Sequence, residues 1–396
     1  MRERWLLDED VAFLNHGSFG ACPEHVLDAQ RQLRDRMERE PVRFFVRDLE
    51  GLIAEARAKV GAFVGASPED FGFVRNATAG VNAVLRSLSF APGDEILVTD
   101  HGYNACTNVA RFVAERSGAT VVTARIPFPL ASEDEAIDAI LASVTERTKL
   151  ALLDHVTSPT GLVLPIEALV DELHRRHVDA LIDGAHAPGM LPLDIEAIGA
   201  AYYTANFHKW VCAPKGAAML WVRPDRQDAI HPAVISHGLN SARARKPFLE
   251  ELDWQGTDDP TPPLCVPVAL DYLASLVEGG WPSIRAQNRD KVLEGRSILC
   301  AALDVPPPTP DSMIGSLAAV PLPDSDGAPP LSALYADPLN IALADEERIQ
   351  VPIVPWPAPG KRLVRISAYL YNTRQEYERL AAALLRHGPA SGSPSR

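Results

Sequence analysis

The fold class is decided by residues 150–186, LALLDHVTSPTGLVLPIEALVDELHRRHVDALIDGAH. This stretch contains two short apolar runs, at residues 150–156 and 180–182, with a helix-like segment between them at residues 165–174. A strand, a helix and a second buried strand in this order predict two parallel strands joined by a crossover helix. The stretch therefore predicts an α/β fold.

The same alternation continues on both sides of this stretch. Further strands are predicted at residues 95–99, 120–126, 202–204 and 219–222, with a helix ending at residue 116 and another around residues 137–141. This order predicts a mostly parallel sheet with helices on both faces. Because such sheets bind ligands at the carboxyl ends of their strands, the polar residues just after each strand are the candidates for function.

The composition is that of a folded, acidic protein. Of its 396 residues, 46% are hydrophobic and 23% are charged, which provides for a sizeable core. The formal net charge is 38 − 52 = −14 at pH 7. Such a charge repels phosphate backbones and anionic lipid surfaces, and no apolar run approaches the ~18 residues that cross a bilayer. We therefore expect neither nucleic acid nor a membrane as a partner.

Cysteine spacing and the N-terminus indicate a cytoplasmic protein. The five cysteines are odd in number and far apart, without a CxxC pair. The first ten residues, MRERWLLDED, lack the apolar core and cleavage site of a secretory signal. His174 and His177 are spaced for metal ligation, but a solvated helix end explains them better, so no metal site is expected.

Four groups of residues carry candidate chemistry at predicted strand ends or helix starts. Asp183 directly follows the buried strand at residues 180–182, and Lys209 lies among aromatic residues. The small residues at 76–78 begin a helix, whose free N–H groups and dipole attract an anion. His101 and Tyr103 follow the strand at residues 95–99 and supply rings.

Together these groups are the parts that pyridoxal phosphate requires. Its phosphate needs backbone donors, its ring needs a flat partner, its pyridine nitrogen needs a buried carboxylate, and its aldehyde needs a lysine. Desolvation by the aromatic neighbours of Lys209 should lower the pKa of its amine and favour the neutral form. A solvated lysine and a helix-capping Asp183 are the plainer alternatives for these two residues.

Several of these segments resemble the class V aminotransferase family of fold type I pyridoxal-phosphate enzymes, most closely its isopenicillin N epimerase-like members. The resemblance covers nearly the whole chain, in family order. It is carried by residues 13–20 (FLNHGSFG), 76–78 (NAT), 100–103 (DHGY), 158–161 (SPTG), 183–189 (DGAHAPG), 208–210 (HKW), 364–367 (VRIS) and 371–373 (YNT). The family fold implies a sheet of the seven-stranded type and a smaller C-terminal α+β domain.

The resemblance implies roles around the cofactor ring. Lys209 would form the Schiff base and Asp183 would pair with the ring nitrogen. His186 would lie near the phenolic oxygen, and a packed core histidine is the alternative for it. His101 would stack on the ring with Tyr103 close by, and these two compete for the stacking role.

Phosphate binding is implied for a second set of residues. Its members are the helix start at Asn76, Ala77 and Thr78, together with His208 and Asn206, which stands where many relatives have serine. The family also implies a homodimer in which Gly256 and Thr257 reach the phosphate of the partner subunit.

The amino-acid substrate would be bound from both ends of the chain. Arg365 resembles the arginine that binds the substrate carboxylate, a task for which a planar fork of donors is suited. Asn15 and Arg47 are further candidates for substrate contact, although ordinary turn and helix roles explain them equally well.

Domain organisation follows from a change of pattern after residues 253–257, where a long helical stretch at residues 267–303 leads into a shorter α+β segment. The expected organisation is an N-terminal segment near the active site (1–20), a large pyridoxal-phosphate-binding domain (21–260), a linking helix with a small C-terminal domain (261–387) and a flexible tail (388–396).

Removal of the Cα proton leaves three reactions open. Epimerisation or racemisation through a Cα carbanion is the first hypothesis, with Tyr103 as the second proton donor. A β-eliminating C–S lyase of secondary or sulfur metabolism and an aminotransferase are the alternatives. Cysteine desulfurase is not expected, because that reaction needs a thiol on a loop of the C-terminal half to accept sulfur, and no cysteine follows Cys300. A pyridoxal-binding regulator would carry a basic helix-turn-helix segment, which this sequence does not show. A dinucleotide-binding dehydrogenase would have a GxGxxG motif after a strand, and none is found here.

Overall fold

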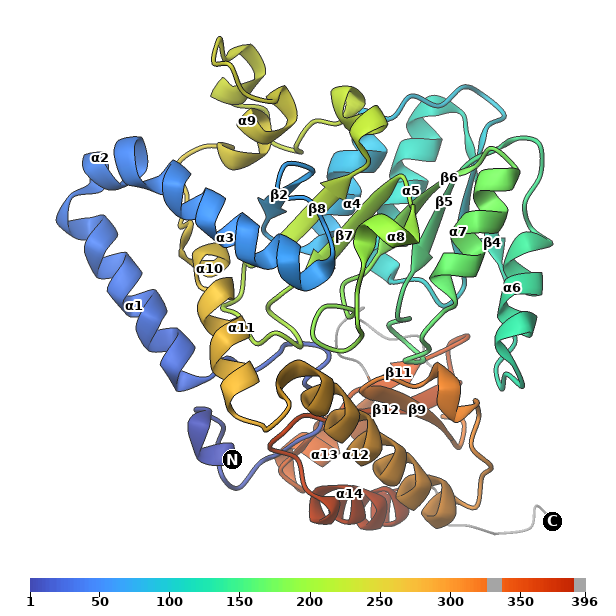
Figure 1. Cartoon of the computed structure of the whole chain (residues 1–396). Helices are drawn as coiled ribbons and strands as arrows, with labels where there is room; N and C mark the ends of the chain where they lie inside the picture. Colours follow the sequence, from blue (N-terminus) through green and yellow to red (C-terminus); the bar gives the residue numbers. More distant parts are fainter. Residues whose placement is uncertain (326–336, 388–396) are drawn as a thin grey trace.

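A seven-stranded sheet forms the centre of the protein in a computed structural model, which describes residues 1–325 and 337–387. The tail predicted at residues 388–396 lies outside the described residues. Figure 1 shows the sheet in the upper part of the molecule, between layers of helices. In spatial order its strands are β2 (Phe71–Val74), β8 (Ala218–Val222), β7 (Tyr202–Asn206), β6 (Asp179–Asp183), β5 (Thr148–Asp154), β3 (Glu95–Thr99) and β4 (Thr120–Ala124).

Five neighbouring strands of this sheet, from β7 to β4, are parallel. Strand β8 is antiparallel to both of its neighbours, β7 and β2. The predicted α/β fold with a mostly parallel sheet is therefore confirmed. The sequence analysis placed six of these strands and missed β2, because a run of four residues that contains a glycine gives a weak strand pattern.

Both faces of the sheet are covered. In β3, Ile96 and Val98 belong to one buried hydrophobic cluster and Leu97 belongs to another, because successive side chains of a strand point to opposite faces. Helices α4 (Ala77–Ser87) and α5 (Asn104–Ser117) pack on the first face, and the second is covered by α3 (Leu49–Val64), α6 (Glu133–Leu141) and α7 (Ile166–Arg175).

A smaller α+β unit lies below the sheet in Figure 1. It is an antiparallel sheet in the order β11 (Ile353–Pro355), β12 (Arg362–Ser367) and β9 (Leu317–Leu322). Apolar residues of this sheet form a separate buried cluster with helices α12 (Gly280–Leu303) and α14 (Arg374–His387). This unit supplies Arg365, from the middle of β12.

The long helical stretch predicted at residues 267–303 is in fact two helices, α11 (Val266–Ser275) and α12. The chain turns between them at Gly279 and Gly280, whose φ angles of 82° and 60° suit glycine because it has no Cβ. Residues of α11 and the start of α12 share a hydrophobic cluster with α3 of the large sheet. The predicted boundary between residues 260 and 261 stays a prediction.

The N-terminal segment joins the two parts of the molecule. Its strand β1 (Ala12–Phe13) pairs in parallel with β10 (Ile349–Gln350) of the smaller unit. A few residues later the chain passes directly over the turn that follows β7. A Cβ on Gly20 would lie 2.4 Å from the carbonyl oxygen of Lys209, so only glycine allows this close approach. The segment is thereby fixed against the backbone of Lys209.

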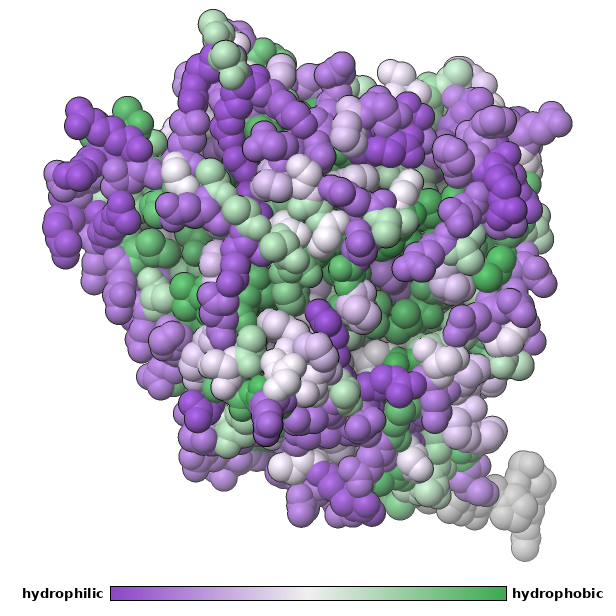
Figure 2. Space-filling model, in the orientation of Figure 1, coloured by the Kyte–Doolittle hydropathy of each residue, from purple (hydrophilic) through white to green (hydrophobic). Residues whose placement is uncertain are grey.

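The remaining helices lie around these units. They are α1 (Glu24–Arg39), α2 (Pro41–Arg43), α8 (Ile195–Ile198), α9 (Pro247–Asp253), α10 (Thr261–Leu264), α13 (Pro338–Asp345), a π-helical turn (Phe44–Asp48) and 3₁₀ turns at Arg2–Arg4, Pro224–Ala229, His237–Asn240 and Asp311–Met313. In the part of the chain that the structure describes, no helix has the length and apolar character to span a bilayer. Hydrophilic residues predominate at the rim of the face shown in Figure 2, while hydrophobic ones gather towards its middle.

Candidate active site

Side chains from several elements meet at the carboxyl edge of the sheet, where it faces the smaller unit. Asp154 and Asp183 are the last residues of the neighbouring strands β5 and β6, and the strand register places them opposite one another. Lys209 lies in the turn after β7. The smaller unit supplies Arg365, whose guanidinium donates to the backbone carbonyl of Ser158, a residue shortly after β5. The two parts of the molecule therefore meet at this edge.

Lys209 is placed as a largely desolvated amine. Its Nζ lies 3.1 Å from Nε2 of His186. Burial lowers the pKa of Lys209 to about 8, although the negative charge of Asp183 acts in the opposite direction. At a given pH near neutrality, a much larger fraction of this amine is neutral than for an exposed lysine, and a neutral amine is the form that attacks an aldehyde.

Asp183 is a buried carboxylate with two hydrogen-bond donors. The thiol of Cys106 lies 3.1 Å from Oδ2, and the N–H of Ala185 lies 3.0 Å from Oδ1. Burial raises the pKa of Asp183, while these two donors and the charge of Lys209 oppose the rise. A carboxylate held in this way is suited to pair with a protonated ring nitrogen.

Asp154 is a second buried carboxyl that the sequence analysis missed. Burial and the neighbouring charge of Asp183 raise its pKa well above the usual range, so Asp154 holds its proton more firmly than an exposed carboxyl. Its Oδ1 accepts a hydrogen bond of 3.2 Å from the backbone N–H of Tyr103. The signal was its place near the end of the predicted strand at residues 150–156, parallel to the strand that ends in Asp183.

At the start of helix α4, where phosphate binding is predicted, two backbone amides already have side-chain acceptors. Asn76 is the N-cap and accepts from the N–H of Ala79 at 2.8 Å, while the N–H of Ala77 donates to Oδ1 of Asn206 at 2.8 Å. These two amides are therefore taken by side chains of the protein. Thr78, which is partly exposed, and the side-chain N–H₂ of Asn206 are left as the better-placed donors for a phosphate.

His208 is fixed by a backbone acceptor. Its Nδ1 lies 3.0 Å from the carbonyl oxygen of Ala217, which can only accept, so Nδ1 carries the hydrogen. Burial lowers the pKa of His208 to about 4, and the charge of Lys209 adds to this effect. In the neutral ring Nε2 is thus an acceptor, and a phosphate contact through it requires a proton on the phosphate or on the ring.

The two rings that competed for the stacking role occupy different places. His101 has no exposed surface and packs edge-on against Trp356 and Phe128. Its ring nitrogens bond to Thr160 Oγ1 (2.7 Å) and to a backbone carbonyl oxygen (3.1 Å). Tyr103 is 40% exposed. Partial burial raises the pKa of its hydroxyl, the charge of Asp183 raises it further, and the charge of Arg365 opposes the rise. Tyr103 is therefore the more exposed of the two rings and is close enough to Asp183 and Arg365 to feel their charges, while the choice of the stacking ring stays a prediction.

Arg365 is only 5% exposed, and no carboxylate among the described residues forms an ion pair with it. One of its terminal nitrogens donates to Ser18 Oγ at 2.8 Å, and the other contacts Ser158, whose Oγ lies 3.3 Å away. Its buried Nε has no hydrogen-bond partner. A desolvated guanidinium with an unused donor indicates an anionic ligand, since an unpaired buried charge is unfavourable.

The remaining predicted site residues do not all lie at this edge of the sheet. Asn15 belongs to the N-terminal segment beside Ser18, and its buried Oδ1 has no partner. Arg47 is exposed on the π-helical turn after α2, at the far end of the arm formed by α1 and α3 in Figure 1, so the structure does not bring it to this site. Gly256 and Thr257 are exposed, and the next residue, Asp258, forms a 2.6 Å ion pair with Arg75 at the start of α4.

These residues fit a phosphorylated pyridine aldehyde joined to an amino acid. The set combines an amine with a lowered pKa, a buried carboxylate, a helix start, a half-exposed phenol and an unpaired buried guanidinium. Among the residues that the structure describes, no group of three or more His, Cys, Asp or Glu side chains is arranged to hold a metal ion.

Comparison with known proteins agrees with this arrangement. Residues 20–380 match the family model of Aminotransferase class-V. The chain is 36% identical to isopenicillin N epimerase of Amycolatopsis lactamdurans, over 97% of this chain and 96% of that one. It is 32% identical to a probable chloroplastic L-cysteine desulfhydrase of Arabidopsis thaliana, over 95% of this chain and 83% of that one.

A solved structure of similar fold is the cystine C-S lyase C-DES in complex with cysteine persulfide, with a TM-score of 0.79, 22% identity, and 96% and 99% of the two chains covered. Another structure of C-DES, with glycine covalently linked to the PLP cofactor, has a TM-score of 0.77 at 21% identity, with 97% and 98% covered. These structures share the fold of this chain. The chain therefore belongs to the class V aminotransferase family, whose fold is of type I and whose cofactor is pyridoxal 5′-phosphate.

Proposed function

We propose that this protein is an epimerase or racemase that acts at Cα of an amino acid or of a compound that contains one, in the manner of isopenicillin N epimerase. The observation that carries the proposal is that the buried Lys209 amine of lowered pKa and the half-exposed phenol of Tyr103 both lie within the electrostatic reach of Asp183 and Arg365 at this edge. Inversion at carbon needs two groups that exchange protons on opposite faces. The 36% identity to isopenicillin N epimerase over almost the whole chain supports the same reaction.

Each residue then has a defined task. Pyridoxal phosphate, when bound, withdraws electrons from Cα of the amino acid attached to it and so makes the Cα proton acidic. Asp183 keeps a proton on the ring nitrogen, and Arg365 holds the carboxylate and thereby orients the Cα–H bond. Lys209 Nζ takes the proton from one face, and the Tyr103 hydroxyl delivers one to the other.

The Tyr103 assignment is tested by separating proton exchange from inversion. The assay follows deuterium entry at Cα together with optical rotation, for a panel of amino acids in D₂O. Tyr103→Phe should lower inversion by roughly 100-fold or more, the scale of one acid or base group, while exchange with retention through Lys209 persists. The matched control is Tyr272→Phe, since Tyr272 lies on α11 and contacts Arg4. Undiminished inversion in Tyr103→Phe would remove this residue from the mechanism.

A β-eliminating C–S lyase is the second candidate, favoured by the 32% identity to a probable L-cysteine desulfhydrase. The same site would remove the Cα proton but release a thiol from Cβ. Assays of pyruvate, ammonia and thiol from cysteine and its conjugates separate the two, because an epimerase yields almost none of these products. A desulfurase reaction is not proposed, since all five cysteines are buried and none follows Cys300.

We further propose a homodimer, as is usual for the family, in which the exposed Gly256 and Thr257 reach the phosphate of the partner subunit. Sedimentation analysis tests the dimer. Loss of phosphate affinity in a mixed dimer that carries Thr257→Ala in only one subunit tests the contact, and a monomeric, active enzyme would contradict both.

A further inference from the structure

His186 is the middle member of a chain of three side chains that ends at the reactive amine. The indole Nε1 of Trp210 lies 3.3 Å from Nδ1 of His186. Nε2 of His186 lies 3.1 Å from Nζ of Lys209. Trp210 directly follows Lys209 in the chain, whereas His186 comes from the turn after β6. The two contacts together engage both nitrogens of the imidazole ring.

The chemistry of the indole fixes the direction of this chain. An indole N–H can donate a hydrogen bond but cannot accept one, so Nδ1 of His186 must be an unprotonated acceptor. Burial lowers the pKa of His186 well below its usual range, and the charges of Lys209 and Arg365 add to the effect, so the ring is neutral. In a neutral imidazole with a bare Nδ1, the hydrogen is on Nε2. Nε2–H therefore points at Nζ, and it can be donated only to a neutral amine.

We propose that Trp210 is a positioning residue that fixes the tautomer of His186, so that the ring donates Nε2–H to the lone pair of Lys209 and disfavours the ammonium form of that lysine. This inference rests on the proposed function, because it assigns a task to Lys209 as the base at Cα. A proton taken up by Nζ would face the Nε2–H hydrogen, so the amine would pass the proton on more readily. Trp210 itself touches neither substrate nor cofactor in this role.

The other charged groups around Lys209 do not take over the hydrogen bond that His186 forms with its Nζ. Asp183 and Asp154 favour the ammonium form through their charges, and so does Cys106 when ionised, while Arg365 disfavours it from the smaller unit. Among these groups, only His186 is hydrogen-bonded to Nζ in the described structure. The tautomer of that one ring therefore decides whether Nζ meets a donor or an acceptor.

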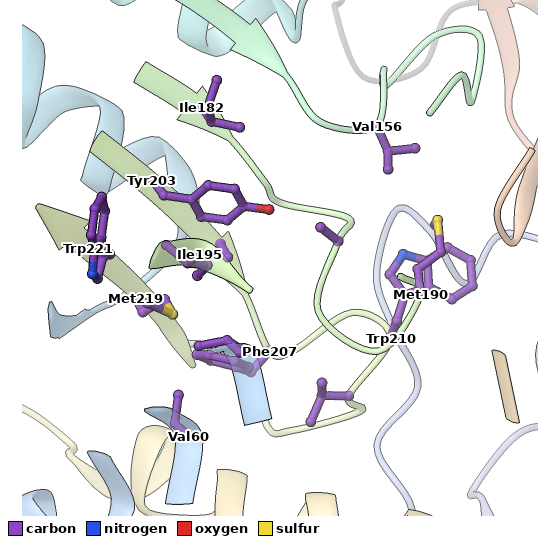
Figure 3. Close-up of a cluster of buried hydrophobic side chains, with 14 of the residues drawn as sticks. Val60, Val156, Ile182, Met190, Ile195, Tyr203, Phe207, Trp210, Met219 and Trp221 are labelled. Carbon is purple, nitrogen blue, oxygen red and sulfur yellow. The ribbon is translucent and has the colours of Figure 1, made fainter. Parts of the chain in front are cut away.

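Packing holds the indole in the orientation that this role needs. Trp210 is fully buried, and its ring lies 5.0 Å from the ring of His16. The hydroxyl of Tyr369 donates to its carbonyl oxygen at 3.0 Å. A Cβ added at Gly189 would lie 2.8 Å from that same carbonyl oxygen, so the backbone is tightly enclosed as well. Figure 3 shows Trp210 beside Met190, well apart from Trp221 in the same hydrophobic cluster.

The test compares Trp210→Phe with Trp221→Phe, both in the holoenzyme and in the cofactor-free protein, where Lys209 carries a free amine. Trp221 is as deeply buried, but its Nε1 has no hydrogen-bond partner, so its substitution removes a similar volume and no comparable hydrogen bond. With ¹⁵N-labelled histidine and tryptophan, NMR reads which nitrogen of His186 carries hydrogen. We expect Nε2–H alone in the unaltered protein and in Trp221→Phe. In Trp210→Phe the tautomer ratio should shift by about tenfold towards Nδ1–H, with a similar loss in the rate of deuterium entry at Cα.

The outcomes separate this inference from the proposed function. Equal tautomer ratios in Trp210→Phe and in the unaltered protein, or a hydrogen on Nδ1 of His186 in the unaltered protein, would overturn the inference even in an active epimerase. If no Cα exchange is found with any amino acid, the proposed function fails, but the tautomer can still be read. If Trp210→Phe does not fold, the unaltered protein decides, through the presence or absence of an N–N coupling between Trp210 and His186.

Discussion

Replacing Arg365 by lysine is the sharpest test of how substrate is bound. The guanidinium is buried, it is anchored by Ser18 and Ser158, and its Nε has no partner. Nη2 uses only one of its two N–H groups on Ser18, so its second N–H and the Nε–H make two donors for a carboxylate while these anchors are kept. Lysine at this position keeps the charge but loses the planar fork, so one of two charge-assisted hydrogen bonds to the substrate is lost.

The expected change in KM follows from the loss of one hydrogen bond to the substrate carboxylate. A hydrogen bond to a charged group contributes about 1.5–3 kcal/mol, and each 1.36 kcal/mol is a factor of ten. The KM for amino acids should therefore rise roughly 10- to 150-fold in Arg365→Lys, with a smaller change in kcat. The control is Arg362→Lys, three residues earlier in β12, because Arg362 contacts Pro323 and Asp337 of its own chain. It should leave the KM unchanged.

The assay is the initial rate of deuterium entry at Cα, for an amino acid and for its carboxamide. The unaltered enzyme should prefer the carboxylate strongly, and Arg365→Lys should lose most of that preference. A KM that changes less than twofold in a folded, cofactor-loaded Arg365→Lys protein would refute the reasoning. An equal change for the carboxylate and the carboxamide would refute it as well.

Three further predictions concern the amine, the thiols and the N-terminal segment. Burial lowers the pKa of Lys209 to about 8, so the rate at which cofactor-free protein takes up pyridoxal phosphate should rise with pH and level off above a midpoint of about 8. A midpoint near 10.5, the pKa of an ordinary lysine, would contradict this. All five cysteines are buried, so none should react with a thiol reagent in the native protein at pH 7, whereas all five should react after denaturation; fast labelling of even one would be the contrary result. Gly20→Ala should destabilise the protein by about 1–3 kcal/mol and weaken cofactor binding, because its Cβ would meet the Lys209 backbone at 2.4 Å. The control, Gly51→Ala, has open space around it in α3 and should stabilise the protein by about 0.5–1 kcal/mol. Equal melting temperatures for the two variants would show that Gly20 is not tightly packed.

The strand and helix pattern predicted the fold class correctly, because the parallel strands are short apolar runs separated by amphipathic helices. It failed where the pattern is weak. Strand β2 (Phe71–Val74) is short, and it pairs with the antiparallel strand β8 rather than with a sequential neighbour. The turn at Gly279 and Gly280 was also missed, because the apolar spacing continues on both sides of it.

The candidate site was predicted in its parts but not in its geometry. Lys209, Asp183 and Arg365 stood out because each lies in a matching segment, and the structure brings them to one edge. The pairing of Asp154 with Asp183 depends on strand register, which no local pattern reveals. The different surroundings of His101 and Tyr103 likewise depend on Trp356, which is distant in sequence and packs against the ring of His101.

The account depends most directly on Lys209 as the residue that binds the aldehyde of pyridoxal phosphate. The measurement is reduction of the purified holoenzyme with borohydride, followed by proteolysis and mass spectrometry of its lysine peptides. The account predicts one pyridoxyl-phosphate group for each chain, on the peptide that contains Lys209, and loss of the visible absorption band in Lys209→Ala. The label on nearby Lys215, or no labelled lysine in a protein that binds the cofactor, would contradict it.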